Sequence, residues 1–144
     1  MMTCETLSAD TERRFLIPAT VDTASSTSYP GARSGATAWL GTDGLLWLFG
    51  GYGTDSSGVI RWLSDLWAFD AANKNWTWFS GSTTGGTRGA YGTKGTADNV
   101  NVPGARYGAA PWVDTAGRLW LFGGYGADSA GTGGWLNDLW SFTK

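Results

Sequence analysis

The chain has 144 residues, a formal charge of −2 and only 15% charged residues, together with 23 glycines and 10 tryptophans. Average globular proteins carry roughly one quarter charged residues. With so few charges and no basic run, the composition argues against nucleic acid or an anionic membrane as a partner. No apolar stretch approaches the roughly 20 residues that span a bilayer. Abundant turn residues between short aromatic-rich runs are typical of an all-β protein.

Residues 1–29 resemble no other part of the chain. Arg13 and Arg14 precede an apolar run, 15–17, that is too short for the core of a secretion signal. The single cysteine, Cys4, cannot form an internal disulfide, so cysteine gives no indication of the compartment. We expect a poorly ordered segment that supplies no strand like those of the repeat that follows.

Residues 30–71 recur at residues 103–144, shifted by 73 positions without a gap, and 26 of the 42 aligned residues are identical. Repetition at a fixed period marks an architecture in which one unit cannot bury its apolar surface alone. We therefore divide the chain into an N-terminal segment, 1–29, a first unit with a long connecting loop, 30–102, and a second unit, 103–144.

The first unit predicts four strands. Residues 35–40 and 45–49 flank a tight turn at Asp43 and Gly44, because glycine accepts the positive φ of such turns. Gly50 and Gly51 are expected to end the second strand, and a loop over 52–64 to lead to a third strand at 65–69. A turn at 70–74 then precedes a fourth strand at 75–79, which completes an antiparallel meander. The second unit has no counterpart of this fourth strand, which predicts an unpaired edge.

The order Gly-Gly, Asp-Leu-Trp-x-Phe and Trp-x-Trp resembles the kelch repeat, in particular the bacterial type found with galactose-oxidase-like propellers. The resemblance covers residues 30–144. It implies an all-β partial kelch-type β-propeller made of two antiparallel four-stranded blades in tandem, the second incomplete, and an extracellular or cell-surface location. Because propellers close with about four to eight blades, we expect either further blades of the same propeller or self-association.

Residues repeated in both units are expected to be structural, because each unit solves the same packing problem. An arginine after Pro-Gly-Ala is expected to bind the aspartate that opens the third strand, since buried carboxylates need donors; an anion site is the alternative. The repeated aromatic residues are expected to form the core, with a ligand platform as the alternative. The predicted structural repeat residues are Arg33, Gly50, Gly51, Asp65, Trp67, Arg106, Gly123, Gly124, Asp138 and Trp140.

The loops at one rim carry large aromatics and one aspartate each, and loops on a rigid scaffold commonly contact partners. Simple loop packing is the alternative for the aromatics. A calcium site is the alternative for the aspartates, although one carboxylate per loop is far fewer than the ligands Ca²⁺ takes. The candidate residues for contact with a protein or carbohydrate partner are Tyr52, Asp55, Trp62, Tyr125, Asp128 and Trp135.

The resemblance also raises the question of copper oxidase chemistry, for which galactose oxidases use His ligands and a Tyr crosslinked to Cys. This chain contains no histidine, and Cys4 lies outside the repeat. Its two glutamates, Glu5 and Glu12, also lie there. We therefore expect no catalytic, metal or cofactor site, and a non-catalytic interaction scaffold. The alternative is a structural portion of a larger galactose-oxidase-like enzyme whose catalytic residues lie outside this chain.

The isolated chain is accordingly predicted to retain no stoichiometric copper and to show no oxidase activity. Imidazole nitrogens are common ligands of protein-bound copper, and the sequence contains none. The measurement is metal analysis after incubation with Cu²⁺ and washing with a chelator. One tightly held copper ion per chain would contradict the prediction.

Overall fold

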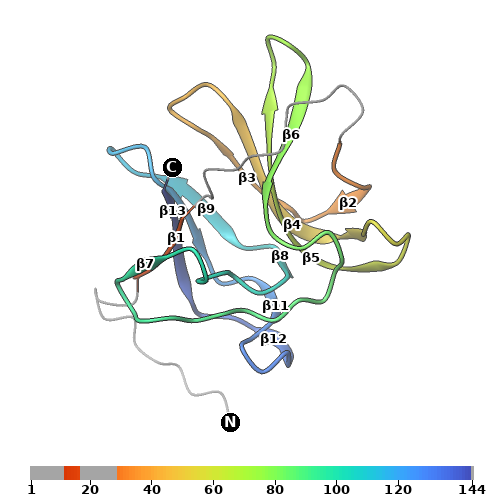
Figure 1. Cartoon of the computed structure of the whole chain (residues 1–144), viewed down its shortest axis with the longest axis vertical. Coiled ribbons are helices and arrows are strands. Elements are labelled where there is room, and N and C mark those ends of the chain that lie inside the picture. The colour runs from red at the N-terminus through yellow and green to blue at the C-terminus, as the bar shows by residue number, and fades with distance from the viewer. Residues whose placement is uncertain (1–11, 17–28, 144) are drawn as a thin grey trace.

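The computed structural model describes residues 12–16 and 29–143, and this part of the chain consists of strands and loops without a helix (Figure 1). Accordingly, the described residues include no helix that could cross a membrane. The strands form two larger sheets, one per repeat unit, and a small three-stranded sheet. The two larger sheets lie beside one another, joined by the long connector that follows the first unit (Figure 1).

The first sheet contains four main strands: β3 (Thr37–Leu40), β4 (Leu46–Thr54), β5 (Ile60–Asp70) and β6 (Asn75–Ser80). They pair antiparallel in chain order, and the two-residue β2 (Arg33–Ser34) pairs with the far end of β4. This is the predicted meander of four antiparallel strands. Strand β4 lies between β3 and β5 in this sheet, and within its apolar run Trp47 and Phe49 are buried while Leu46 is exposed.

Two predicted boundaries in this unit are wrong. β4 does not end at the glycine pair, and the expected loop over 52–64 is a short turn, because β4 and β5 continue to pair as far as Thr54 and Ile60. Gly50 and Gly51 instead form a bulge, with φ of 62° and 104°. A Cβ on Gly50 would lie 2.6 Å from the carbonyl oxygen of Arg106, so a side chain cannot be accommodated there. Asp65 therefore lies inside β5 and does not open it.

In the second unit the corresponding strands are shorter and separate into two sheets. The larger sheet contains β9 (Ala110–Val113), β10 (Leu119–Phe122) and β13 (Leu139–Thr143), paired antiparallel. The smaller sheet contains β8 (Arg106–Tyr107), β11 (Tyr125–Ala127) and β12 (Gly133–Trp135). The interruption between β10 and β11 falls at Gly123 and Gly124, the counterparts of the bulge in β4.

The predicted unpaired edge of the second unit is occupied. Strand β1 (Glu12–Leu16) runs parallel to β13, and its other side pairs with β7 (Ala97–Asp98). β1 thus takes the place beside β13 that β6 takes beside β5, although β6 is antiparallel. No strand was predicted within residues 1–29, so β1 is a departure from the prediction. The segment was also expected to be poorly ordered, and its residues 1–11 and 17–28 lie outside the described part of the chain.

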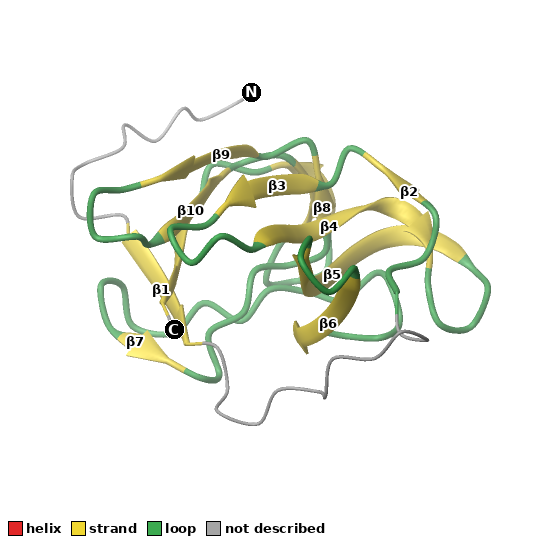
Figure 2. Ribbon diagram, turned by 90° about the horizontal axis from the view of Figure 1, so that it is seen from above, coloured by secondary structure: helices red, strands yellow, loops and turns green. Residues whose placement is uncertain are grey.

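The main core lies between the two larger sheets, whose inner strands β3 and β9 lie side by side (Figure 2). The Trp39 indole crosses the junction and donates a hydrogen bond to the Trp120 carbonyl at 2.7 Å. Phe142 contacts both Trp39 and Phe49, with ring centroids 5.7 and 5.6 Å apart. The buried cluster contains Trp39, Trp47, Phe49, Leu66, Ala68, Ala109, Leu119, Leu121, Trp140 and Phe142. Each unit therefore contributes one face to a shared core, as a repeat architecture requires.

Candidate functional site

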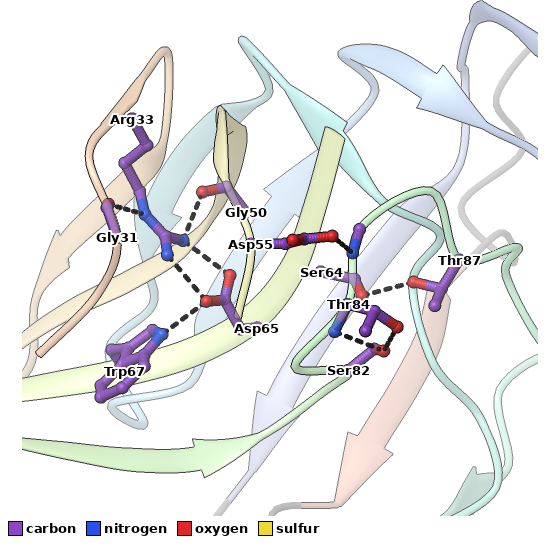
Figure 3. A network of polar contacts seen from close by, with 11 residues as sticks. Gly31, Arg33, Gly50, Asp55, Ser64, Asp65, Trp67, Ser82, Thr84 and Thr87 are labelled. Atoms are coloured by element: carbon purple, nitrogen blue, oxygen red, sulfur yellow. Dashed lines mark hydrogen bonds and ion pairs between the residues drawn. The ribbon is translucent and has the colours of Figure 1, made fainter. Parts of the chain in front are cut away.

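An arginine and an aspartate form the same buried ion pair in each unit, and Figure 3 shows the pair of the first unit, Arg33 and Asp65. In the first unit, the two terminal nitrogens of Arg33 donate to the two carboxylate oxygens of Asp65 at 2.6 and 2.8 Å. Arg33 also donates to the carbonyls of Gly31 and Gly50, and the Trp67 indole donates to Asp65 at 2.7 Å. One guanidinium thus joins the entry of the unit, the bulge in β4 and the middle of β5.

The second unit repeats this arrangement with one addition. Arg106 donates to both oxygens of Asp138, at 2.5 and 2.8 Å, and to the carbonyls of Gly104 and Gly123. Trp140 donates to the same carboxylate at 2.7 Å, as Trp67 does in the first unit. The additional donor is the hydroxyl of Tyr91, at 2.6 Å, which comes from the connector. Each carboxylate oxygen of Asp138 therefore accepts at least one hydrogen bond from the protein.

The surroundings of this second ion pair shift two pKa values. Burial by itself raises the pKa of Asp138, but the hydrogen bonds and charge of Arg106, with the hydrogen bonds of Tyr91 and Trp140, outweigh it and hold the pKa below its ordinary value. The pKa of Tyr91 is raised, first by burial and then by the neighbouring negative charge of Asp138. The lowered pKa of Asp138 favours its ionised carboxylate, and the raised pKa of Tyr91 favours its neutral hydroxyl, as both occur at neutral pH.

Asp138→Ala is predicted to lower the free energy of unfolding by about 3–5 kcal/mol, because it leaves the Arg106 charge buried without its partner. The Arg106 side chain is fully buried. Asp65→Ala is predicted to cost less, since Asp65 lacks the Tyr91 bond and the Arg33 side chain is slightly exposed. The measurement is urea unfolding, with the exposed Asp98→Ala as the control. A variant at Asp138 as stable as the parent chain would show that the ion pair is not structural.

Tyr91→Phe is predicted to destabilise the chain at neutral pH by about 1.5–3 kcal/mol, the contribution of a hydrogen bond to a charged acceptor. Because the pKa of Tyr91 is raised in the folded state, its contribution to stability is fully present below the ordinary tyrosine value of 10.0. This contribution is lost as the pH rises beyond that value. The difference in unfolding free energy between wild type and Tyr91→Phe should therefore stay constant up to about pH 10 and shrink above it. A difference that does not shrink at alkaline pH would contradict this assignment.

The two rim aspartates anchor turns. Asp55 is buried and accepts hydrogen bonds from the backbone of Ser57, Val59 and Gly85 and from the Ser57 hydroxyl. These donors, with the Gly85 amide foremost, hold the pKa of Asp55 well below its ordinary value. Asp128 accepts two backbone amides of its own turn in the same manner. Among the described residues no three acidic, His or Cys side chains gather in a way that could hold a metal ion.

The rim aromatics of both units meet in one contiguous cluster. Cross-strand register pairs Tyr52 with Trp62 and places Tyr125 between Tyr107 and Trp135. The units then join through Tyr52 against Tyr107, with ring centroids 6.4 Å apart, and through Trp62 against Tyr125, at 5.6 Å. Tyr125 also contacts Tyr107 and Trp135 at 5.9 and 5.1 Å. We call this cluster the aromatic row; its members are Tyr52, Trp62, Tyr107, Tyr125 and Trp135.

The aromatic row is open to solvent at three positions. Trp135 is 75% exposed, and Tyr52 and Tyr107 are also exposed, whereas Trp62 and Tyr125 are half-buried. Four of the six predicted contact residues thus lie together, while the two aspartates serve the turns beside them. Tyr107 was not among the candidates, because the matching position in the first unit is Ser34 and the repeat therefore gives no signal there.

A separate hollow of about 810 Å³ lies between β6, the connector and the core. Its floor is apolar, with Phe49, Phe79 and Phe142, and its rim includes Ser80 and Arg88. The buried indole nitrogen of Trp78, a residue that lines this hollow and a smaller one, finds no hydrogen-bond acceptor within the part of the chain that the structure describes. The described residues that line the hollow include no acidic side chain.

No protein-family model matches the chain, and no curated protein matches it either. A solved structure titled "Structure of YjhT" is similar, with a TM-score of 0.46 and 21% sequence identity over 65% of this chain. The matched region covers 21% of that longer chain. The antiparallel sheets of the present structure are compatible with a β-propeller-like fold.

Proposed function

We propose that the chain is a non-catalytic interaction module of the kelch-type β-propeller class, which binds a protein or glycan partner through the aromatic row. The two repeat units would be neighbouring blades, a reading supported by the gapless 73-residue repeat and by the shared core between two meander sheets. The rigid scaffold sets the row in place, and the partner contacts its open rings.

The observation that carries the proposal is the convergence of five aromatic side chains from both units on one rim, three of them exposed. Exposed tryptophan and tyrosine offer a large apolar area with few rotatable bonds, and they dominate binding energy at interfaces. Trp135 is three-quarters exposed and lies in contact with other rings of the row, and contiguous exposed apolar patches mark interaction sites. The buried ion pairs and the turn aspartates, in contrast, have their hydrogen bonds satisfied internally.

The non-catalytic assignment is supported by the chemistry of the described residues. The buried carboxylates Asp65 and Asp138 are each neutralised by an arginine, so neither is available as a general acid or base. The turn aspartate Asp55 is saturated with donors and has a lowered pKa, the opposite of what a general acid needs. The scaffold therefore offers recognition surface in place of reactive groups.

Trp135→Ala and Tyr107→Ala are predicted to weaken partner binding by at least about tenfold each, the loss expected from truncating an aromatic anchor. The measurement is binding of the labelled full chain to a glycan array and to displayed peptide and protein libraries, followed by affinities for the ligands recovered. Val100→Ser, which removes an exposed apolar side chain from the connector, is the matched control. Ligands whose affinity is unchanged by both row variants would contradict the proposal.

A further inference from the structure

The junction between the two units brings together two different faces. The first unit presents Trp39 and Phe49, and we call this side of a unit its leading face. The second unit presents Leu119 and Phe142, and we call this side its receiving face. Repetition gives every unit both faces, so one leading face and one receiving face are left over in the chain.

The leftover leading face is on the second unit, where Trp112 and Phe122 take the positions of Trp39 and Phe49. Trp39 is 3% exposed because it is covered by the second unit, whereas Trp112 is 42% exposed. The ring of Trp112 stacks flat on Trp120, with centroids 5.6 Å apart and planes 5° apart. Trp120 is 9% exposed beneath this stack, so the apolar surface open to solvent here is that of the Trp112 indole.

The leftover receiving face is on the first unit, where Leu46 and Phe69 take the positions of Leu119 and Phe142. Leu119, inside the junction, is 4% exposed, whereas Leu46, on the leftover face, is 40% exposed. Phe69 is half-buried, while Phe142 is buried. The residue types at these positions are identical in the two units, so the chemistry that forms the internal junction is present again at each end.

We infer that a second copy of this chain docks head to tail, with the leading face of its second unit on the receiving face of the first unit of its neighbour. In this contact Trp112 would occupy the position that Trp39 occupies inside the chain. One difference is that Thr37, which donates to the Ala109 carbonyl across the internal junction, corresponds to Ala110. The intermolecular junction therefore lacks this hydrogen bond.

Because the contact joins two different surfaces, it is heterologous, and its repetition produces a ring if the rotation closes. A propeller-type ring of about four to eight sheets would contain two to four copies. The inference does not depend on the proposed partner binding, since Trp112 and Leu46 lie outside the aromatic row. Failure of assembly and failure of binding can therefore be told apart.

The test is the mass of the full chain measured by size-exclusion chromatography with light scattering, across the micromolar concentration range. Wild type is expected to have a mass of several chains that rises with concentration or plateaus at a closed ring. Trp112→Ser blocks the leading face and Leu46→Glu blocks the receiving face, so each variant alone is expected to have the mass of one chain. Val100→Ser is expected to assemble like wild type.

Mixing the two blocked variants provides the decisive measurement. Each variant retains one intact face, and the two intact faces differ. A head-to-tail contact therefore predicts a complex of one chain of each variant that grows no further. A two-fold symmetric contact, which joins two copies of the same face, predicts no complex between the two variants. Circular dichroism checks that both variants fold, and the milder Trp112→Gln and Leu46→Gln replace any that does not. A wild-type chain that remains a monomer throughout, or a mixture that remains monomeric, would overturn the inference.

Discussion

The buried arginine–aspartate pair is the constraint around which each unit is built. The carboxylates of Asp65 and Asp138 lie where β5 and its counterpart pass the glycine bulge, and burial there would be prohibitive for an unpaired charge. The guanidinium provides the countercharge and also binds the carbonyl of the first bulge glycine, which the distorted strand cannot pair in the regular way. One side chain therefore solves a charge problem and a backbone problem together.

This constraint explains why the glycines and the arginine occur as a set. Gly50 leaves space for the Arg106 carbonyl of the neighbouring unit, and its positive φ produces the bulge whose carbonyl Arg33 binds. Removal of any member would leave either a steric conflict or an orphaned polar group. The bulge separates the inner part of β4, which carries Trp47 and Phe49 of the core, from its outer part, which carries Tyr52 of the aromatic row. The same local chemistry thus positions both the core and the aromatic row.

The sequence predicted the parts of the fold that depend on periodicity and on identical repetition. The four strands of the first unit, the all-β class and the pairing partner of Arg33 could be inferred because they follow from apolar runs, turn glycines and charge matching in both units. The extension of β4 and β5 to Thr54 and Ile60 could not, since Asp55 sets that turn through hydrogen bonds to Ser57, Val59 and Gly85 that no spacing indicates. Strand β1 was missed because it shares no pattern with β6 and pairs in parallel.

The candidate site was predictable in part for a related reason. Identical residues identify the ion pair, the core and four of the five aromatic side chains of the row, but the fit between these rings also depends on two positions where the units differ. Gly133 replaces Ile60 of the first unit, and a Cβ there would lie 2.5 Å from the Trp62 ring. Tyr107 replaces Ser34 and supplies the ring that contacts Tyr52. The first substitution makes room for an indole from the neighbouring unit, and the second extends the ring contacts across the junction. The row therefore combines four aromatic side chains that the repeat shares with two departures from the repeat, which fit the rings together at the junction between the units.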